Sequence, residues 1–368
     1  MSTDTLDQAT SSLTALALVN PLQSGERYAL HPLTRAYVRD ALLQEPAAER
    51  EMGMRFVNYW IEFAERNGGE TFESYEKYGY LEEEWDNLYA AANWLVKTAD
   101  LQASQARDAE AAKLLVDLWG HLRQFTWFVG RWDDKVQLSV CAYSAALATN
   151  FWLAAGWTAY DVGWILYLRD QLDDAALWAE RCTQAWAHDV PVRDRAFSLR
   201  LQACILQKQK EFVRAEALMQ EALRMWETGD AWDRSVGLED LAEFAHERGD
   251  YATAQDYYQR TLELSTEIGD KEGIAAVYAG LGNLALDQKK PVEARAYFEK
   301  ESLAAREVGR IDLVAGAQFG TARAWALEGR ADLALPLARQ AQVTLERIRD
   351  SAVQDVAAFL AELQGEQS

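Results

Sequence analysis

The chain has 368 residues, a length typical of two or three domains, and 37 basic against 58 acidic side chains give it a formal charge of −21. So acidic a chain is repelled by nucleic-acid phosphates and by anionic membranes, which argues against DNA binding by the chain alone. The 49% of hydrophobic residues exclude wholesale disorder, and only 6 prolines among many Ala, Leu, Glu and Arg predict an almost wholly helical protein.

The first 46 residues are predicted to form two helices separated by a hairpin. Residues 5–18 have an amphipathic helical pattern, and the following stretch reads as a hairpin with a turn at Ser24 and Gly25. Pro32 then opens a second helix, at a position where its missing N–H costs nothing. The order of helix, two-stranded wing and helix resembles the second half of a winged-helix domain, so we expect a partial winged-helix element over 1–46.

The sequence RYALHPLTRAYVRDAL (27–42) resembles the end of the winged-helix module in bacterial signalling ATPases of the STAND (NB-ARC) type. In that family a histidine at the position of His31 reaches the bound nucleotide. Residues 80–100 resemble the helical linker that follows the module, which predicts a linker over 47–107. No phosphate-binding loop of the form G-x-x-x-x-G-K-[ST] is present. The resemblance therefore implies a sensor part whose partner is the missing ATPase core, without which His31 has no nucleotide to touch.

A repeat of about 40 residues occupies the rest of the chain. A position inside the second helix of each unit recurs at intervals of 40, 40, 39, 40 and 40 residues. It carries a small residue in five of the six units and matches only weakly in the first, and further small residues lie twelve positions before the five. Each unit is thus a helical hairpin that cannot bury its apolar face alone, so neighbours must stack. The recurring second-helix positions are Lys135, Ala175, Ala215, Ala254, Ala294 and Ala334.

This pattern resembles the tetratricopeptide repeat in its long form. It predicts an all-α fold, a right-handed tetratricopeptide-repeat superhelix of about six hairpins over 108–350. The amphipathic stretch 351–364 reads as the capping helix that such arrays need, leaving 351–368 as cap and tail.

In tetratricopeptide arrays the first helix of each unit lines a concave groove. Counting from the small residue Gly163, the groove positions of that unit carry four aromatic residues, and neighbouring units add further rings and cations. Aromatic residues beside Arg are typical of interface hot spots, although the rings could also pack between helices. The residues expected in this part of the groove are Trp127, Phe128, Trp157, Tyr160, Trp164, Tyr167, Phe197, Arg200 and Lys208.

Further along, the groove positions carry Glu239, Glu243 and His246, and Arg323 follows in a later unit. These charges either meet a partner of mixed charge or form an ordinary solvated face. The linker helices could also fill the groove, which would be an autoinhibitory packing. The two-carboxylate clamp of chaperone-binding adaptors is not expected, because the matching positions carry neither Lys nor Asn.

We expect no enzymatic activity, cofactor or metal, because none of the four histidines has a metal-ligand spacing and a solenoid offers a groove rather than a dry pocket. Three widely spaced cysteines and the lack of a signal peptide indicate the cytoplasm. The expected function is recognition of a protein, peptide or small effector in the groove, as the sensor of a STAND-type regulator. Two alternatives remain: a transcription regulator whose winged helix reads DNA while the repeats sense an inducer, and a freestanding scaffold.

Overall fold

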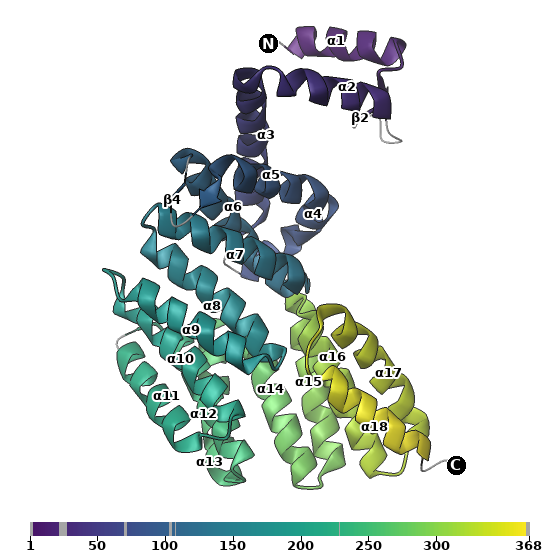
Figure 1. Ribbon diagram of the computed structural model, residues 1–368. Helices are drawn as coiled ribbons and strands as arrows, with labels where there is room; N and C mark the ends of the chain where they lie inside the picture. The colour runs from purple at the N-terminus through teal and green to yellow at the C-terminus, as the bar shows by residue number, and fades with distance from the viewer. Residues whose placement is uncertain are drawn as a thin grey trace. The chain divides into compact units, whose positions relative to one another are not determined.

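The computed structural model describes residues 3–21, 28–69, 72–102, 105–106, 108–227 and 229–365 (Figure 1). The chain divides into two compact units, 1–60 and 61–368. Across the described residues the fold is all-α apart from two short hairpins. No helix in this part of the chain combines the length and hydrophobicity needed to cross a membrane.

The first unit contains the expected order of helix, hairpin and helix. Helix α1 (Thr3–Ala15) leads to strands β1 (Val19–Pro21) and β2 (Tyr28–Leu30), which pair antiparallel. Helix α2 (Pro32–Leu43) follows with its proline in the first turn, as the sequence predicts. The predicted turn at Ser24 and Gly25 lies outside the described residues.

Further helices lie between α2 and the repeats along the chain. Helix α3 (Pro46–Asn67) spans the division between the two units, and it is followed by the 3-10 helix η1 (Phe72–Lys77), α4 (Tyr78–Glu83) and α5 (Trp85–Ala99). A second hairpin, β3 (Leu101–Gln102) and β4 (Gln105–Ala106), precedes the array. This region is helical, as expected, and Tyr78, Leu81 and Leu88 bury their side chains in the second unit.

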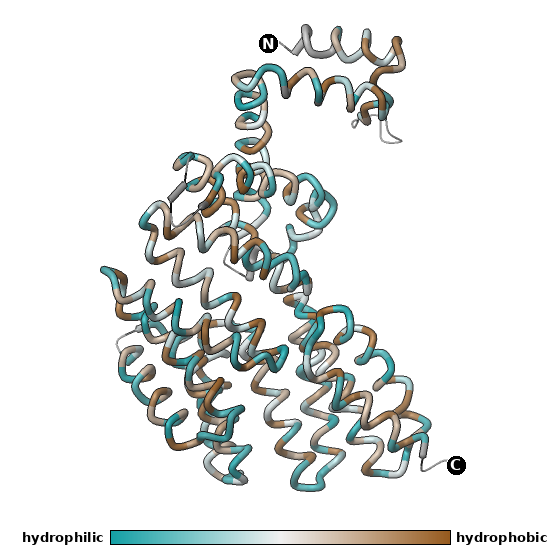
Figure 2. Tube along the Cα trace, viewed as in Figure 1, coloured by the Kyte–Doolittle hydropathy of each residue, from teal (hydrophilic) through white to brown (hydrophobic). Residues whose placement is uncertain are grey.

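Six helical hairpins follow, which confirms the predicted number of repeats, and α18 (Val353–Gly365) packs on the last one. Hydrophobic and hydrophilic residues alternate along these helices, as helices with one buried side require (Figure 2). The hairpins are α6 (Ala109–Phe128) with α7 (Trp132–Ala148), α8 (Trp152–Leu168) with α9 (Leu172–Trp186), α10 (Val192–Lys208) with α11 (Phe212–Trp226), α12 (Ala231–Glu247) with α13 (Tyr251–Ile268), α14 (Lys271–Asp287) with α15 (Pro291–Val308), and α16 (Ile311–Leu327) with α17 (Ala331–Ile348).

Small residues let the helices of neighbouring hairpins approach closely. The five alanines at the recurring second-helix positions are all fully buried. The ring of Phe298, 2% exposed, lies against Gly282 on one side and Gly320 on the other, and a Cβ on either glycine would come within 2.5 Å of it. The repeat spacing therefore encodes the closest contacts of the array.

The first helices of the hairpins form the inner face of the array. Successive first helices, such as α8 with α10 and α14 with α16, pack directly on one another. Among the described residues, no two second helices pack comparably, so the second helices lie on the outside of the curve. The term inner face is used below for the side chains that α6, α8, α10, α12, α14 and α16 present to this concave side.

Candidate functional site

Arg200 connects three successive hairpins across the inner face. Its guanidinium donates hydrogen bonds to both carboxylate oxygens of Asp240 on α12, at 2.6 and 3.1 Å. It also donates to Tyr160 Oη on α8 at 2.7 Å. The side chains of Arg200 and Asp240 are only 14% and 6% exposed, so the predicted groove cation belongs largely to the framework.

Two other predicted residues of later hairpins, His246 and Arg323, are also paired. His246 Nε2 lies 2.8 Å from Asp287 Oδ2, and Arg323 donates to Asn283 Oδ1 over 3.0 Å. In each case the partners are 41 or 40 residues apart, which is one repeat. The repeat thus aligns side chains of complementary chemistry on neighbouring helices.

A buried ion triad replaces the usual small residues in the first hairpin. Arg123 donates to both oxygens of Asp161, at 3.1 and 2.9 Å, and Lys135 Nζ lies 2.8 Å from the same carboxylate. Burial alone would raise the pKa of Asp161, but the two cations together lower it. Burial likewise lowers the pKa of Lys135, to about 8, against the attraction of Asp161. Lys135 and Arg123 occupy the two positions at which the other hairpins carry small residues.

The four aromatic residues predicted for α8 lie next to one another along the inner face. Trp164 stacks against Tyr160 with ring centroids 5.8 Å apart and contacts Tyr167 at 5.2 Å. Trp157 contacts Tyr160 at 5.5 Å and donates from Nε1 to Asp194 Oδ1. Tyr160 is 7% exposed and burial raises its pKa, whereas the other three rings remain half-buried.

Cations cover the exposed faces of these rings. The guanidinium of Arg200 lies 4.2 Å from the centre of Trp164, and Lys208 Nζ lies 4.4 Å from that of Tyr167. Lys208 also donates to the backbone oxygen of Tyr167 at 2.9 Å. We refer to Trp157, Tyr160, Trp164, Tyr167, Arg200 and Lys208 as the aromatic–cation ladder.

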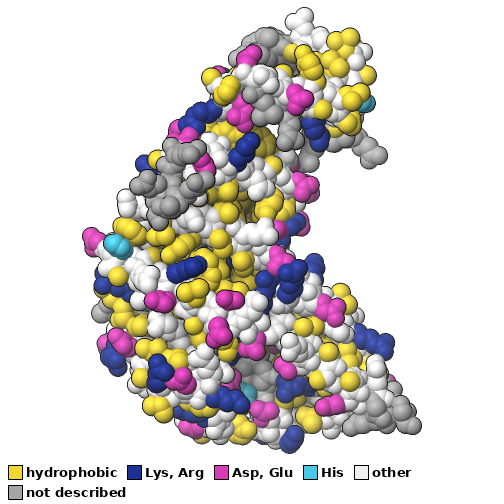
Figure 3. Space-filling view, viewed as in Figure 1, with side chains coloured by type: hydrophobic (Ala, Val, Ile, Leu, Met, Phe, Trp, Pro, Cys, Tyr) yellow, Lys and Arg dark blue, Asp and Glu magenta, His cyan; other side chains and the backbone are white. Residues whose placement is uncertain are grey.

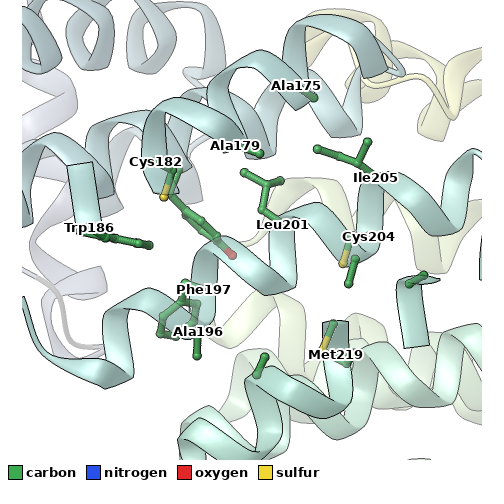
Figure 4. Close-up of a cluster of buried hydrophobic side chains, with 14 of the residues drawn as sticks. Ala175, Ala179, Cys182, Trp186, Ala196, Phe197, Leu201, Cys204, Ile205 and Met219 are labelled. Atoms are coloured by element: carbon green, nitrogen blue, oxygen red, sulfur yellow. The ribbon is translucent and has the colours of Figure 1, made fainter. Parts of the chain in front are cut away.

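Three of the predicted groove aromatics, Tyr160, Phe197 and Phe128, are buried in the core, which corrects the sequence interpretation. Phe197 is 1% exposed and packs against Trp157 and Trp226 in the buried cluster of α8–α11 (Figure 4). Phe128 is 4% exposed and contacts the ring of Tyr78 in α4. Both rings therefore lie on the sides of their helices that face neighbouring helices.

Carboxylates without a cation partner follow the ladder on α12. Glu239, Glu243 and Glu247 lie one turn apart, and no ion pair joins any of them to a described cation. Glu243 keeps an exposed side chain, but it stands inside the curve of the array, where the surrounding protein displaces part of its hydration. This desolvation, together with repulsion by Asp240 and Glu247, raises the pKa of Glu243 to about 7. Desolvation and Glu243 also raise the pKa of Glu239.

The predicted groove residue Trp127 is covered by residues that the sequence interpretation missed. The guanidinium of Arg310 lies 4.6 Å from the centre of the Trp127 ring, and Trp127 Nε1 donates to Glu272 Oε1 at 3.4 Å. Arg310 also forms ion pairs with Glu272 and Asp312. No sequence signal marks these contacts, since more than a hundred residues separate Trp127 from its partners.

His31 caps a helix in the first unit. Its Nδ1 accepts a hydrogen bond from the backbone N–H of Leu33 at 3.3 Å at the start of α2. Large apolar side chains are exposed on the first unit (Figure 3). The most exposed are Leu16, Leu33 and Tyr37, at 68%, 76% and 76%. Within the described residues, no cluster of His, Cys, Asp and Glu has the arrangement of a metal site.

Comparison with known proteins supports the repeat. The tetratricopeptide-repeat family matches residues 233–307. No curated protein sequence matches the chain. Among solved structures, the chain is similar to a Rap protein complexed with Competence and Sporulation Factor, at 11% identity and a TM-score of 0.51 over 86% of this chain and 98% of that one. It is also similar to the apo form of RapI, at 14% identity and a TM-score of 0.52 over 76% of this chain and 98% of that one.

A more distant likeness is to a signal transduction ATPase with numerous domains (STAND) from Pyrococcus horikoshii that has a tetratricopeptide-repeat sensor. The identity is 14% and the TM-score 0.46, over 98% of this chain and 55% of that one. At such low identity, likenesses of this kind bear on the fold alone. The fold is an all-α tetratricopeptide-repeat superhelix, an architecture typical of protein-interaction scaffolds.

Proposed function

We propose that the chain is a non-catalytic recognition array of the cytoplasm that binds a protein or peptide segment on its inner face, between α8 and α12. The observation that carries the proposal is the juxtaposition of the aromatic–cation ladder with the unpaired acids of α12. Rings whose positions are held by stacking and hydrogen bonds offer contact area at little entropic cost. In support, a Rap protein of similar fold is complexed with a factor.

The charge of this surface favours a segment with cationic side chains. Arg200 and Lys208 already have partners within the array, so they leave little positive charge for a ligand. Glu239, Glu243 and Glu247 repel one another, and an incoming Lys or Arg relieves that repulsion. Such a segment would place its cations over α12 and its apolar side chains over the half-buried rings of α8.

The test is affinity capture from host lysate, with the double variant Glu243→Gln/Glu247→Gln compared with the wild type. These side chains are exposed and carry no ion pair, so the variant should fold normally. The matched control is Glu263→Gln/Glu267→Gln, which removes the same charge at the same helical spacing from the exposed side of the outer helix α13. We expect the inner-face variant to lose a partner that the control keeps.

A lysate partner that both variants retain would contradict binding over α12, and so would the absence of any partner for the wild type. A synthetic peptide from a recovered partner, titrated against both variants by calorimetry, then measures the effect directly. We expect the inner-face variant to bind it about tenfold more weakly, with a stronger salt dependence in the wild type.

We further propose that this array is the sensor part of a STAND-type regulator and that the first unit docks on an ATPase core. Two observations support this proposal: the helix–hairpin–helix order of residues 3–43, and the exposed apolar side chains around α2. His31 caps α2 here and would be placed to meet a nucleotide held by that core. In the same capture experiment, Leu33→Ser/Tyr37→Ser should lose a nucleotide-binding ATPase that the wild type recovers. Equal recovery, or no ATPase at all, would refute it.

A further inference from the structure

The array completes a turn and its last hairpins contact its first ones. Both the backbone N–H and the hydroxyl of Ser351 donate to the carbonyl oxygen of Leu168, at 3.1 and 2.7 Å, although 183 residues separate them. Arg169 donates to the carbonyl oxygen of Ile348 at 3.2 Å. The end of α8 thus meets the loop between α17 and α18.

Ion pairs reinforce this contact. Asp133 at the start of α7 accepts from Arg169 at 2.8 Å and pairs with Arg349 at 3.3 Å. Asp133 and Arg349 are 44% and 69% exposed, so water competes for this part of the contact. Arg169 is more buried, and its Nε has no hydrogen-bond partner in the structure. Apolar side chains also join the two ends, since Trp132 and Ile165 belong to one buried cluster with Leu345 and Ile348.

Arg310 forms the second part of the contact. It reaches from the loop before α16 to the inner face of the first hairpin, where it lies over Trp127 and is 6% exposed. Nearby, Gly130 lies so close to Ile311 and Ile348 that a Cβ would collide with both side chains. We call the contacts of Trp127, Gly130, Asp133, Leu168 and Arg169 with Arg310, Ile311 and Ile348–Ser351 the seam.

The seam joins hairpins that are not neighbours in the repeat. In a solenoid, stability is approximately a sum over the hairpins and their nearest-neighbour interfaces. Contact between hairpins that are distant in the repeat adds a further contribution to the stability of the array, beyond its nearest-neighbour interfaces. Because the seam lies outside the nearest-neighbour interfaces, its loss would leave each of those interfaces in place.

We propose that the seam is a latch that closes the inner face of the array at Trp127 and opens to admit a partner. The inference deepens the proposed function, since it assigns a means of regulation to the same inner face. In the closed form Arg310 covers the ring of Trp127, which adjoins the proposed binding surface on the inner face. A partner that prefers the open form shifts the population toward it by its difference in affinity for the two forms.

One backbone amide reports on the seam directly. The N–H of Ser351 bonds across the seam to Leu168, whereas the N–H of the preceding residue, Asp350, bonds locally to Leu345 at 3.0 Å. Amide hydrogen exchange resolved to single residues therefore separates seam opening from fraying of α17.

The first variant is Arg310→Ala, and its matched control is Arg330→Ala. Both arginines precede a helix and form a two-pronged ion pair with the aspartate two residues on, Asp312 and Asp332 respectively. Only Arg310 reaches across the seam. We expect exchange at Ser351 to become about tenfold faster in Arg310→Ala and to stay unchanged in Arg330→Ala, with Asp350 unaffected in both.

A second pair of variants guards against misfolding. Asp133→Asn removes the seam carboxylate, whereas Asp134→Asn alters its neighbour, which pairs with Arg131 in the first hairpin. Faster exchange of the Ser351 amide in Asp133→Asn, but not in Asp134→Asn, supports the latch. Unchanged exchange of the Ser351 amide in both Arg310→Ala and Asp133→Asn overturns the latch. So does exchange that becomes faster to the same extent in the amides of α11, because the seam would then belong to one cooperative core.

A fluorescent probe tests whether the seam closes the inner face. The dye 8-anilinonaphthalene-1-sulfonate should bind Arg310→Ala more strongly than Arg330→Ala, because the rings of Trp127 and Trp132 become accessible. Equal dye binding would refute closure of the inner face. None of these measurements uses a partner, so failure of the capture experiment would reject the recognition function and leave the seam result standing.

Discussion

The two units of the molecule treat large apolar side chains in opposite ways. In the array, Tyr258 and Phe298 are 1% and 2% exposed, because each hairpin covers the apolar face of the one before it. In residues 3–60, Leu33 and Tyr37 are each 76% exposed, and a two-stranded hairpin with two helices is too small to cover them. The difference teaches that repetition supplies the array with its own apolar partners, whereas the first unit leaves large apolar side chains exposed.

The largest effect is expected from Phe298→Ala. The ring fills the space between Gly282 and Gly320, so its loss leaves a cavity in a contact that glycine has made close. We expect the free energy of unfolding of the array to fall by about 4 kcal/mol in urea denaturation. Val292→Ala on the same helix, 67% exposed, is the control and should change little. An equal loss of unfolding free energy in Phe298→Ala and Val292→Ala would show that the close contacts of Phe298 with the two glycines do not stabilise the array.

Asp161→Asn should be nearly as damaging. The substitution leaves Arg123 and Lys135 buried without their counter-charge, which costs about 3 kcal/mol. Because the pKa of Asp161 is lowered in the folded chain, its contribution is present above the pKa of the unfolded carboxyl and is lost as the pH falls through the folded value. Wild type and variant should therefore converge in stability in acid, and parallel pH curves would contradict the ion triad.

A smaller effect is expected in the first unit. His31→Ala removes the side-chain acceptor of the Leu33 N–H at the start of α2, which should cost about 0.5–1 kcal/mol in local stability. Exchange of the Leu33 amide measures it, while the array should unfold as before. His31→Asn keeps an acceptor and serves as control. A fall in the stability of the array would mean that the two units are coupled more strongly than their separate cores imply.

The smallest effect concerns Glu243. Its pKa is raised from 4.5 to about 7 in the folded chain, so between these values the folded chain holds a proton that the unfolded chain has released. Stability should therefore fall as the pH rises through this window. Glu243→Gln should flatten that slope in thermal unfolding, whereas Glu263→Gln on the outer face should leave it unchanged. If the wild type, Glu243→Gln and Glu263→Gln all showed the same dependence of stability on pH, the carboxyl of Glu243 would lie in ordinary solvent.

The sequence alone is sufficient to predict the hairpins, because their signals are local. Helical periodicity and turns indicate all six hairpins, and a small residue every 40 positions marks five of them. The aromatic residues of α8 could be placed together for the same reason, since they lie on one side of one helix. Their grouping could be predicted without knowing which distant residues contact them.

The tertiary structure decided which side chains serve the core and which remain available. Phe197 was a predicted groove residue, but Trp226 and Trp157 close around it, because the width of the inner face depends on how neighbouring hairpins twist. Arg200 and His246 could not be recognised as paired until the helices that carry Asp240 and Asp287 were in place. The seam forms only when the twists between all the intervening hairpins together bring the two ends of the array into contact. No short stretch of sequence determines that sum.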